Sequence, residues 1–111
     1  MSRAGYDPGW LRHRIRIERP VATPDGAGGE SVAWESLATL WARIEPLEAR
    51  EHVAADHLAE TVSHRLIVRW RNDVAGGMRA VYRGRRFRIL ATHDPDESRR
   101  YLVLSTTEEK P

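Results

Sequence analysis

The 111-residue sequence contains no cysteine, which excludes a disulfide framework, a zinc site built on thiolates and a cysteine nucleophile. Its longest aliphatic runs are three residues, such as 66–68 and 102–104, whereas a membrane-spanning helix needs about 20 apolar residues. The first residues, 1–8, include no apolar stretch of the kind that defines a signal peptide. We therefore expect a protein that folds in a cytoplasm and has no contact with a membrane.

Lysine is almost absent too. The 18 basic residues are 17 arginines and Lys110, and the 16 acidic residues reduce the formal net charge to +2. This balance is mild for a nucleic-acid-binding protein, and a GC-rich genome accounts for the preference for arginine. A chain of this length forms one small domain with a modest core. We treat 1–111 as a single domain whose ends, 1–9 and 107–111, are expected to be flexible.

The dominant pattern is alternation of apolar and polar residues with a period of two, which is typical of half-buried strands. It is clearest at 11–18, where Leu11, His13, Ile15 and Ile17 share one face. Proline cannot donate a hydrogen bond to a sheet, so Pro20 and Pro24 are predicted to end this strand. A glycine-rich loop follows at 23–29. The further predicted strands are 37–46, 61–71, 78–82, 85–92 and 101–106.

Residues 47–60 interrupt this pattern. They are rich in Ala, Glu and Leu, which are good helix formers, but their apolar residues form only a weak stripe. We predict a helical or flexible insertion between the second and third strands. The six strands, joined mostly by turns such as the one at Gly84, predict a mainly β protein: a small antiparallel β-barrel or sandwich.

The histidines and acidic residues form no recognisable catalytic or metal-binding motif. His52 and His57 are five residues apart and do not share a helix face. Ser63 and His64 are only sequence neighbours, and nothing in the sequence indicates an orienting acid or an oxyanion hole. The acidic residues at 94–97 lack the ligand spacing of a calcium loop. We expect no enzymatic activity, no cofactor and no metal.

The second half of the chain is crowded with arginines, and Trp70, Tyr82 and Phe87 lie among them. Basic strands with aromatic residues can bind nucleic acid, as OB-type barrels do. The candidate nucleic-acid contacts are Arg83, Arg85, Arg86 and Arg88. However, the aromatic residues mostly alternate away from the arginines, and pairing of Arg with Glu across neighbouring strands is the simpler interpretation. A small nucleic-acid-binding β-barrel is the alternative hypothesis.

Several segments, in this order, resemble a known family. They are Leu11–Ile17, the tryptophan-bearing Trp34–Leu47, His64–Arg71, and Tyr82–Ile89 followed by Asp94 and Leu102–Leu104. Together they resemble the head–tail joining proteins of tailed bacteriophages, which are also called head closure or stopper proteins. The resemblance covers about residues 10–108 and depends on the ordered set, since no single motif is diagnostic.

The resemblance implies a structural virion protein, in a phage, a prophage remnant or a gene transfer agent. Such proteins form a ring, sixfold or twelvefold, between the portal with its adaptor protein and the tail. The ring closes the channel around packaged double-stranded DNA and offers a docking surface to the tail terminator or tail tube protein. In that family the insertion after the second strand is the channel gate. Its polar residues here are Glu48, Arg50, Glu51, His52, Asp56, His57 and Glu60.

A ring also accounts for the low hydrophobic content of 41%, because small domains with thin cores often complete their burial in an oligomer. The residues expected at the subunit interface are Trp41, Arg43, Arg65, Ile67 and Arg69. The apolar residues on the second faces of the strands either contact a neighbour or line the opposite sheet of a sandwich. These residues are Trp41, Ile67, Val81, Leu90 and Val103.

Overall fold

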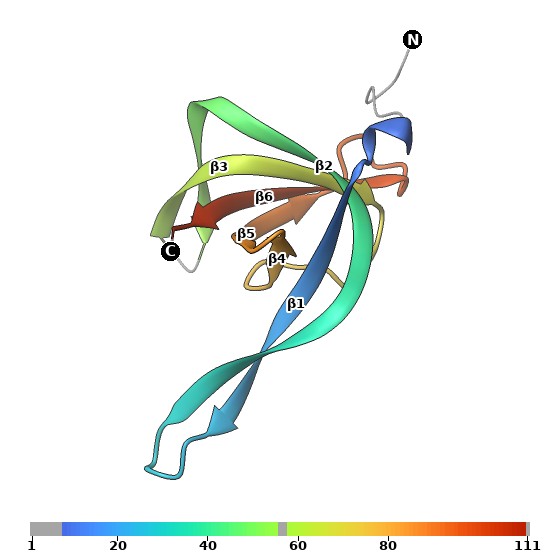
Figure 1. The fold of residues 1–111 in the computed structure, drawn as a ribbon. Helices are drawn as coiled ribbons and strands as arrows, with labels where there is room; N and C mark the ends of the chain where they lie inside the picture. The colour runs from blue at the N-terminus through green and yellow to red at the C-terminus, as the bar shows by residue number, and fades with distance from the viewer. Residues whose placement is uncertain (1–7, 56–57, 111) are drawn as a thin grey trace.

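The computed structural model describes residues 8–55 and 58–110, which form a short 3₁₀ helix and six strands (Figure 1). The elements are η1 (Pro8–Trp10), β1 (His13–Pro24), β2 (Glu30–Ala55), β3 (Leu58–Arg69), β4 (Arg79–Tyr82), β5 (Arg85–His93) and β6 (Tyr101–Glu109). Every pairing is antiparallel, and the order β1-β2-β3-β6-β5-β4 is closed by pairing of β4 with β1. The predicted mainly β fold is confirmed, as one closed sheet. None of the described helices is long and apolar enough to span a membrane.

The core lies inside the closed sheet and follows from the alternation. Ile15 and Ile17 of β1 are completely buried and pack with Leu66 and Val68 of β3. Their partners from the other strands are Ala42, Ala80, Phe87, Ile89, Leu102 and Leu104, and Val74 joins them from the loop between β3 and β4. The alternation of β5 is interrupted by a register shift between Ile89 and Ala91, so Leu90 is also buried and Ala91 is half-buried. A β-bulge of this kind changes the face to which the following side chains point.

A second, smaller apolar cluster lies on the outer face of the sheet. Leu11, which follows η1, packs with Ile67, Tyr101 and Val103. Ile67 and Val103 are side by side because they are register partners on β3 and β6. The N-terminal segment therefore covers outward-facing apolar residues of the sheet within the same chain.

The insertion predicted at 47–60 as helical or flexible contains no helix in its described residues. Residues 47–55 continue β2 and residues 58–60 begin β3, while Asp56 and His57 lie outside the described residues. Helix propensity is a weak preference that pairing with a neighbouring strand overrides, and here Glu51–Ala55 pairs with Leu58–Val62. The register shifts between Pro46 and Glu51, and Figure 1 shows β2 bending sharply in this region.

Of the two prolines predicted to end the first strand, Pro20 lies within β1 and Pro24 is its last residue. β1 continues through Pro20, which pairs with Trp34, to Pro24, which pairs with Glu30. Among the described strands, β2 is the only neighbour of β1 beyond Glu18. The other edge of β1 is therefore open there, and a proline without an N–H is tolerated. Pro46 lies at the register shift of β2, which is another position that tolerates proline.

The extension of β1 and β2 produces a two-stranded ribbon, residues 19–35, which we call the arm. It projects from one end of the closed sheet (Figure 1) and makes the molecule long, with extents of 58 × 27 × 27 Å.

At the other strands the predictions agree more closely with the structure. The β4–β5 turn has positive φ at Arg83 (49°) and Gly84 (80°), as predicted for Gly84. β6 continues to Glu109, three residues beyond the predicted end.

Candidate functional site

The β2–β3 hairpin, residues 46–64, is attached to a strand that is not its neighbour in the sheet. Glu60 of β3 accepts a hydrogen bond of 2.9 Å from Nη2 of Arg88 of β5. The Glu60 side chain is 27% exposed and that of Arg88 is 41% exposed. The hairpin therefore has a partly exposed ionic attachment to the closed sheet.

A polar cluster lies at the base of the same hairpin. Ser63 Oγ shares a 2.8 Å hydrogen bond with His64 Nδ1 and accepts another, also 2.8 Å, from the backbone N–H of Glu108. The Glu108 carboxylate accepts two hydrogen bonds from Arg85, at 2.9 and 3.1 Å. The His64 ring meets the edge of Phe87, with ring centroids 5.0 Å apart. These contacts fasten β3 to β6 and β5 where the hairpin leaves the sheet.

The cluster contains Ser, His and Glu but does not have the geometry of a catalytic triad. In a triad the acid is hydrogen-bonded to Nδ1 of the imidazole and the serine to Nε2. Here Ser63 is bonded to Nδ1 instead. The nearest oxygen of Glu108 is 4.0 Å from Nε2, which is too far for a hydrogen bond. Burial lowers the pKa of His64, the negative charge of Glu108 opposes that shift, and the Arg85 charge adds to it. A neutral His64 in this position serves packing.

The seven predicted gate residues are only partly described. Glu48 is exposed, and Glu60 is bonded to Arg88. The backbone of 50–52 belongs to β2, but the side chains of Arg50, Glu51 and His52 lie outside the described part, as do Asp56 and His57 entirely. Of these seven, the structure therefore gives side-chain positions for two.

The five predicted interface residues share one face of β2 and β3, because Arg43 pairs with Ile67. Trp41 is 56% exposed and is one of three exposed large apolar side chains in the described residues. Ile67 is 0% exposed, so its side chain is already covered within the chain. Arg43 donates to Glu45 at 2.8 Å and lies 4.9 Å above the ring of Trp10. The sequence analysis did not select Trp10, which is 40% exposed.

Arg65 and Arg69 complete this face on β3. Arg65 is half-buried and Arg69 is exposed. The face thus presents two tryptophans, Trp10 and Trp41, among arginines. We call it the tryptophan face, and it includes Trp10, Trp41, Arg43, Arg65 and Arg69.

The four arginines of the nucleic-acid hypothesis do not form an open basic platform. Arg85 is bonded to Glu108 and Arg88 to Glu60. Arg86 is exposed and has no ion pair within the described ranges. Phe87, one of the aromatic residues that would stack on bases, is completely buried. The structure therefore brings these arginines to one hairpin but engages two of them with carboxylates.

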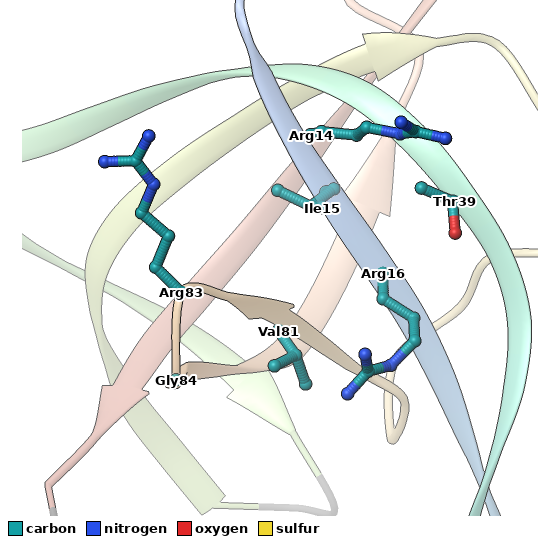
Figure 2. Close-up of a pocket in the computed structure, with 7 residues that line it drawn as sticks. All are labelled: Arg14, Ile15, Arg16, Thr39, Val81, Arg83 and Gly84. Atoms are coloured by element: carbon teal, nitrogen blue, oxygen red, sulfur yellow. The ribbon is translucent and has the colours of Figure 1, made fainter.

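A basic cleft of about 480 Å³ opens between β1 and the β4–β5 turn. Its arginines are Arg14, Arg16 and Arg83, and its remaining lining residues are Ile15, Thr39, Val81 and Gly84. Figure 2 shows Arg14 and Arg83 on opposite sides of the opening. Arg16 donates to Glu18 at 2.8 Å. The guanidinium carbon of Arg14 lies 5.9 Å from the centroid of the Trp41 ring, and that of Arg83 lies 5.3 Å from the centroid of the Tyr82 ring. Neither arginine is paired with a carboxylate of the described residues.

In the described ranges, no three His, Asp or Glu side chains are grouped closely enough to hold a metal ion. What the site offers is a projecting hairpin, two basic or aromatic faces and a long arm.

Over residues 6–109 the sequence matches the family described as phage head completion protein. The chain belongs to this family. As a head completion protein it is a structural, virion-associated protein that works together with other phage head and tail proteins.

Two solved structures share the fold of this head completion protein. The protein SF1141 from Shigella flexneri 2a is 25% identical, with a TM-score of 0.68, covering 93% of this chain and 96% of that chain. A chain from the virion of a native gene transfer agent particle is 23% identical, with a TM-score of 0.62, covering 86% and 94%. No curated protein matches the chain. The resemblance to head–tail joining proteins is therefore confirmed at the level of the family.

Proposed function

We propose that this head completion protein forms a ring between the portal adaptor and the tail, and that its β2–β3 hairpin closes the DNA channel. The main support is that the hairpin leaves the closed sheet at the register shift after Pro46 and is held back by the ion pair between Glu60 and Arg88. A gate has to be separable from the domain that carries it. Segments that move are drawn from the less stable parts of a fold.

The strength of the attachment fits this role. Partly exposed ion pairs contribute about 0.2–1 kcal/mol, so Glu60 and Arg88 can separate without loss of the core. The hairpin also carries four acids, Glu48, Glu51, Asp56 and Glu60, against the single arginine Arg50. Negative charge in the channel would repel the DNA phosphates and limit adhesion of DNA during its passage.

The ring interface is proposed at the tryptophan face. Exposed aromatic residues and arginines are enriched in interfaces, and Trp41 with Arg43 provides both. Ile67 lies beneath this face, where it packs with Leu11, Tyr101 and Val103. Arg65 and Arg69 would pair with acids of the adjacent subunit. We propose six or twelve copies per ring, with one rim on the portal adaptor and the other on the tail terminator or tail tube protein.

The surroundings of the four predicted arginines, Arg83, Arg85, Arg86 and Arg88, do not favour the alternative hypothesis of a nucleic-acid-binding barrel. Single-strand binding needs exposed aromatic surfaces beside free cations. Phe87 is in the core, Tyr82 shares a hydrogen bond of 2.9 Å with His13, and Arg85 and Arg88 are paired with acids. Double-stranded DNA remains a proposed neighbour in the lumen of the ring.

Particles from a strain that lacks the gene test the position of the protein. If the protein acts at the neck, electron microscopy will show tailless or emptied heads beside free, finished tails. Normal particles that are filled with DNA and carry tails would contradict the whole proposal. This experiment requires no assumption about which residues form the gate.

The gate is tested by replacing residues 51–59 with a short Gly-Ser linker. The closed sheet should remain folded, because its core residues lie elsewhere, and particles should assemble but lose their DNA. The matched control keeps the hairpin at full length and carries Glu48→Gln, Glu51→Gln and Asp56→Asn, and we expect it to retain DNA. Retention of DNA at the wild-type level by the linker variant would show that the hairpin is not the gate.

A further inference from the structure

The arm has no core of its own. From residue 20 to residue 35 it is two paired strands and a loop, and the loop and most of the side chains are exposed. Val32 is 59% exposed, the largest value among the large apolar side chains of the described residues. A two-stranded ribbon is at best marginally stable alone in water. The arm therefore has the properties of a segment that is covered in the assembled state.

One face of the arm is apolar. Pro20 pairs with Trp34, and Ala22 pairs with Val32, so these four side chains lie together on one side of the ribbon. At the base, Arg79 covers Trp34, with its guanidinium 4.2 Å from the ring. Farther out, Val32 and Ala22 are both exposed. The uncovered apolar part of the arm is thus its outer half.

The arm is also acidic. The arm contains three acids, Asp25, Glu30 and Glu35, and one basic residue, Arg19. Glu35 accepts a hydrogen bond from Arg19 at 2.9 Å, and Asp25 Oδ1 accepts from the backbone N–H groups of Ala27 and Gly29. Glu30 is exposed and has no ion pair within the described ranges. The outer half of the arm therefore combines negative charge with exposed apolar surface.

The basic cleft has the complementary properties. Arg14 and Arg83 line it without a carboxylate partner from the described residues, and Trp41 beside Arg14 is 56% exposed. Unpaired guanidinium groups bind carboxylates well, because their planar donors match the two carboxylate oxygens. The exposed Trp41 ring offers an apolar surface next to them.

We propose that the arm of one copy of this chain docks in the basic cleft of the next copy. Glu30 at the tip pairs with Arg14 or Arg83, and the apolar face at Val32 covers Trp41. The inference rests on the proposed ring, which it deepens by naming the contact between neighbouring subunits. A contact between two different surfaces of one molecule is heterologous, and repetition of such a contact closes a ring when the rotation allows it.

The arm cannot occupy the cleft of its own chain. Arg14 and Arg16 of the cleft lie on the same continuous strand as the arm, and β1 runs from them outward to Pro24. At about 3.3 Å per residue, the eight residues from Arg16 to Pro24 carry the tip roughly 26 Å away. DNA phosphates would satisfy the arginines but would leave the apolar arm exposed. A second copy satisfies both surfaces.

The absence of cysteine makes the contact testable by disulfide cross-linking. A chain with both Ala27→Cys at the tip and Thr39→Cys at the cleft should give a ladder of covalent oligomers under oxidation, because each copy then has one donor and one acceptor position. The control is Ala27→Cys with Glu97→Cys, since Glu97 is exposed on the loop before β6 and outside the cleft. A disulfide requires Cα atoms within about 7 Å, so random collisions give little product.

Charge reversal tests the chemistry of the contact. Glu30→Arg should lower the yield of the Ala27→Cys/Thr39→Cys ladder by about fivefold, which is the upper range for one exposed ion pair. Adding Arg14→Glu to the same chain should restore most of the yield. Glu97→Arg, with the same change of charge in a remote loop, should have no effect. A yield that is unchanged by Glu30→Arg would overturn the assignment of Glu30.

The cross-linking is done on the concentrated purified chain and on assembled particles. A ladder in either preparation, with the Glu97→Cys control silent, supports the docking of the arm on a second copy. Absence of the ladder from both overturns it, as does cross-linking of the arm to a different virion protein. If particles that lack the gene are normal while the ladder forms, the arm contact stands and the proposed neck function fails.

Discussion

Glu60 and Arg88 are joined by a 2.9 Å hydrogen bond, although β6 lies between their strands in the sheet. This is possible because the ladder between β3 and β6 begins at His64 with Thr106. Residues 58–62 of β3 therefore lie beyond the last rung and pair with β2 alone. The hairpin is free to turn toward β5, where Arg88 meets it.

Arg88→Ala should loosen this hairpin without unfolding the domain. Hydrogen exchange of the paired amides in 51–55 and 58–62 should become up to about fivefold faster, since a partly exposed ion pair contributes at most about 1 kcal/mol. The melting temperature should fall by about 1–5 °C. Arg86→Ala, at an exposed arginine of the same strand, is the control and should leave the exchange unchanged. Equal exchange rates in the two variants would show that Glu60 and Arg88 do not hold the hairpin.

Glu18→Gln should destabilise the protein by about 1–3 kcal/mol at pH 7, because Glu18 is buried and accepts hydrogen bonds from both Arg16 and Arg79. Burial raises the pKa of Glu18, but the two arginines together outweigh it and hold the pKa below the ordinary value of 4.5. The stabilisation by the ionised group is therefore present above pH 4.5 and is lost as the pH falls through the lower folded-state pKa.

Urea denaturation of wild type and Glu18→Gln between pH 7 and 3 measures this dependence. The difference in the free energy of unfolding between wild type and Glu18→Gln should become smaller as the pH falls. Glu35→Gln, which breaks an exposed pair with Arg19, should cost less than about 1 kcal/mol at pH 7. A difference for Glu18→Gln that is the same at every pH would show that the charge of Glu18 does not contribute.

His64 should titrate with a midpoint below 6.5 in the folded protein, because burial lowers its pKa. The folded state then prefers neutral His64, so this residue adds stability above pH 6.5 that is lost as the pH falls through its folded-state pKa. NMR titration of the imidazole protons measures the midpoint. Glu108→Gln removes the negative charge that opposes the shift and should lower the midpoint further. A midpoint above 6.5 would contradict the buried, neutral assignment.

Gly76→Ala should destabilise the fold by about 1–3 kcal/mol, since the new methyl group would lie 2.7 Å from the carbonyl oxygen of Leu90. That carbonyl belongs to the bulge of β5, and Gly77 next door donates to the Ile89 carbonyl at 2.9 Å, so the backbone has little room to move. Urea denaturation measures the effect, with Ala75→Ser, at an exposed neighbour, as the control. A loss no greater than that of Ala75→Ser would show that the turn adjusts freely.

Much of the fold could be predicted from local patterns. The alternation at Ile15 and Ile17 identified the inner face of β1, and Gly84 marked the turn between β4 and β5. The ordered segments also indicated the family, which the match over residues 6–109 confirms. The inner face of β1 and the β4–β5 turn could be predicted because alternation and turn geometry depend on residues that are close in the chain.

The failures share a cause. Pro20 remains within a strand because one edge of β1 is open there, and residues 51–55 are strand because β3 pairs with them despite their helix propensity. The burial of Ile67 by Leu11 and Val103, which come from other parts of the chain, likewise could not be predicted from the local pattern. In each case the decisive neighbour is distant in sequence.

By itself the sequence determined which residues alternate, where tight turns occur and which family the ordered segments belong to. Only the tertiary structure decided that the sheet closes, that the arm projects and that Arg14 and Arg83 line a cleft without a carboxylate partner from the described residues. The physical reason is that an ion pair or a cleft depends on strand order and register. These bring together residues such as Glu60 and Arg88, 28 positions apart, and no local pattern encodes that distance.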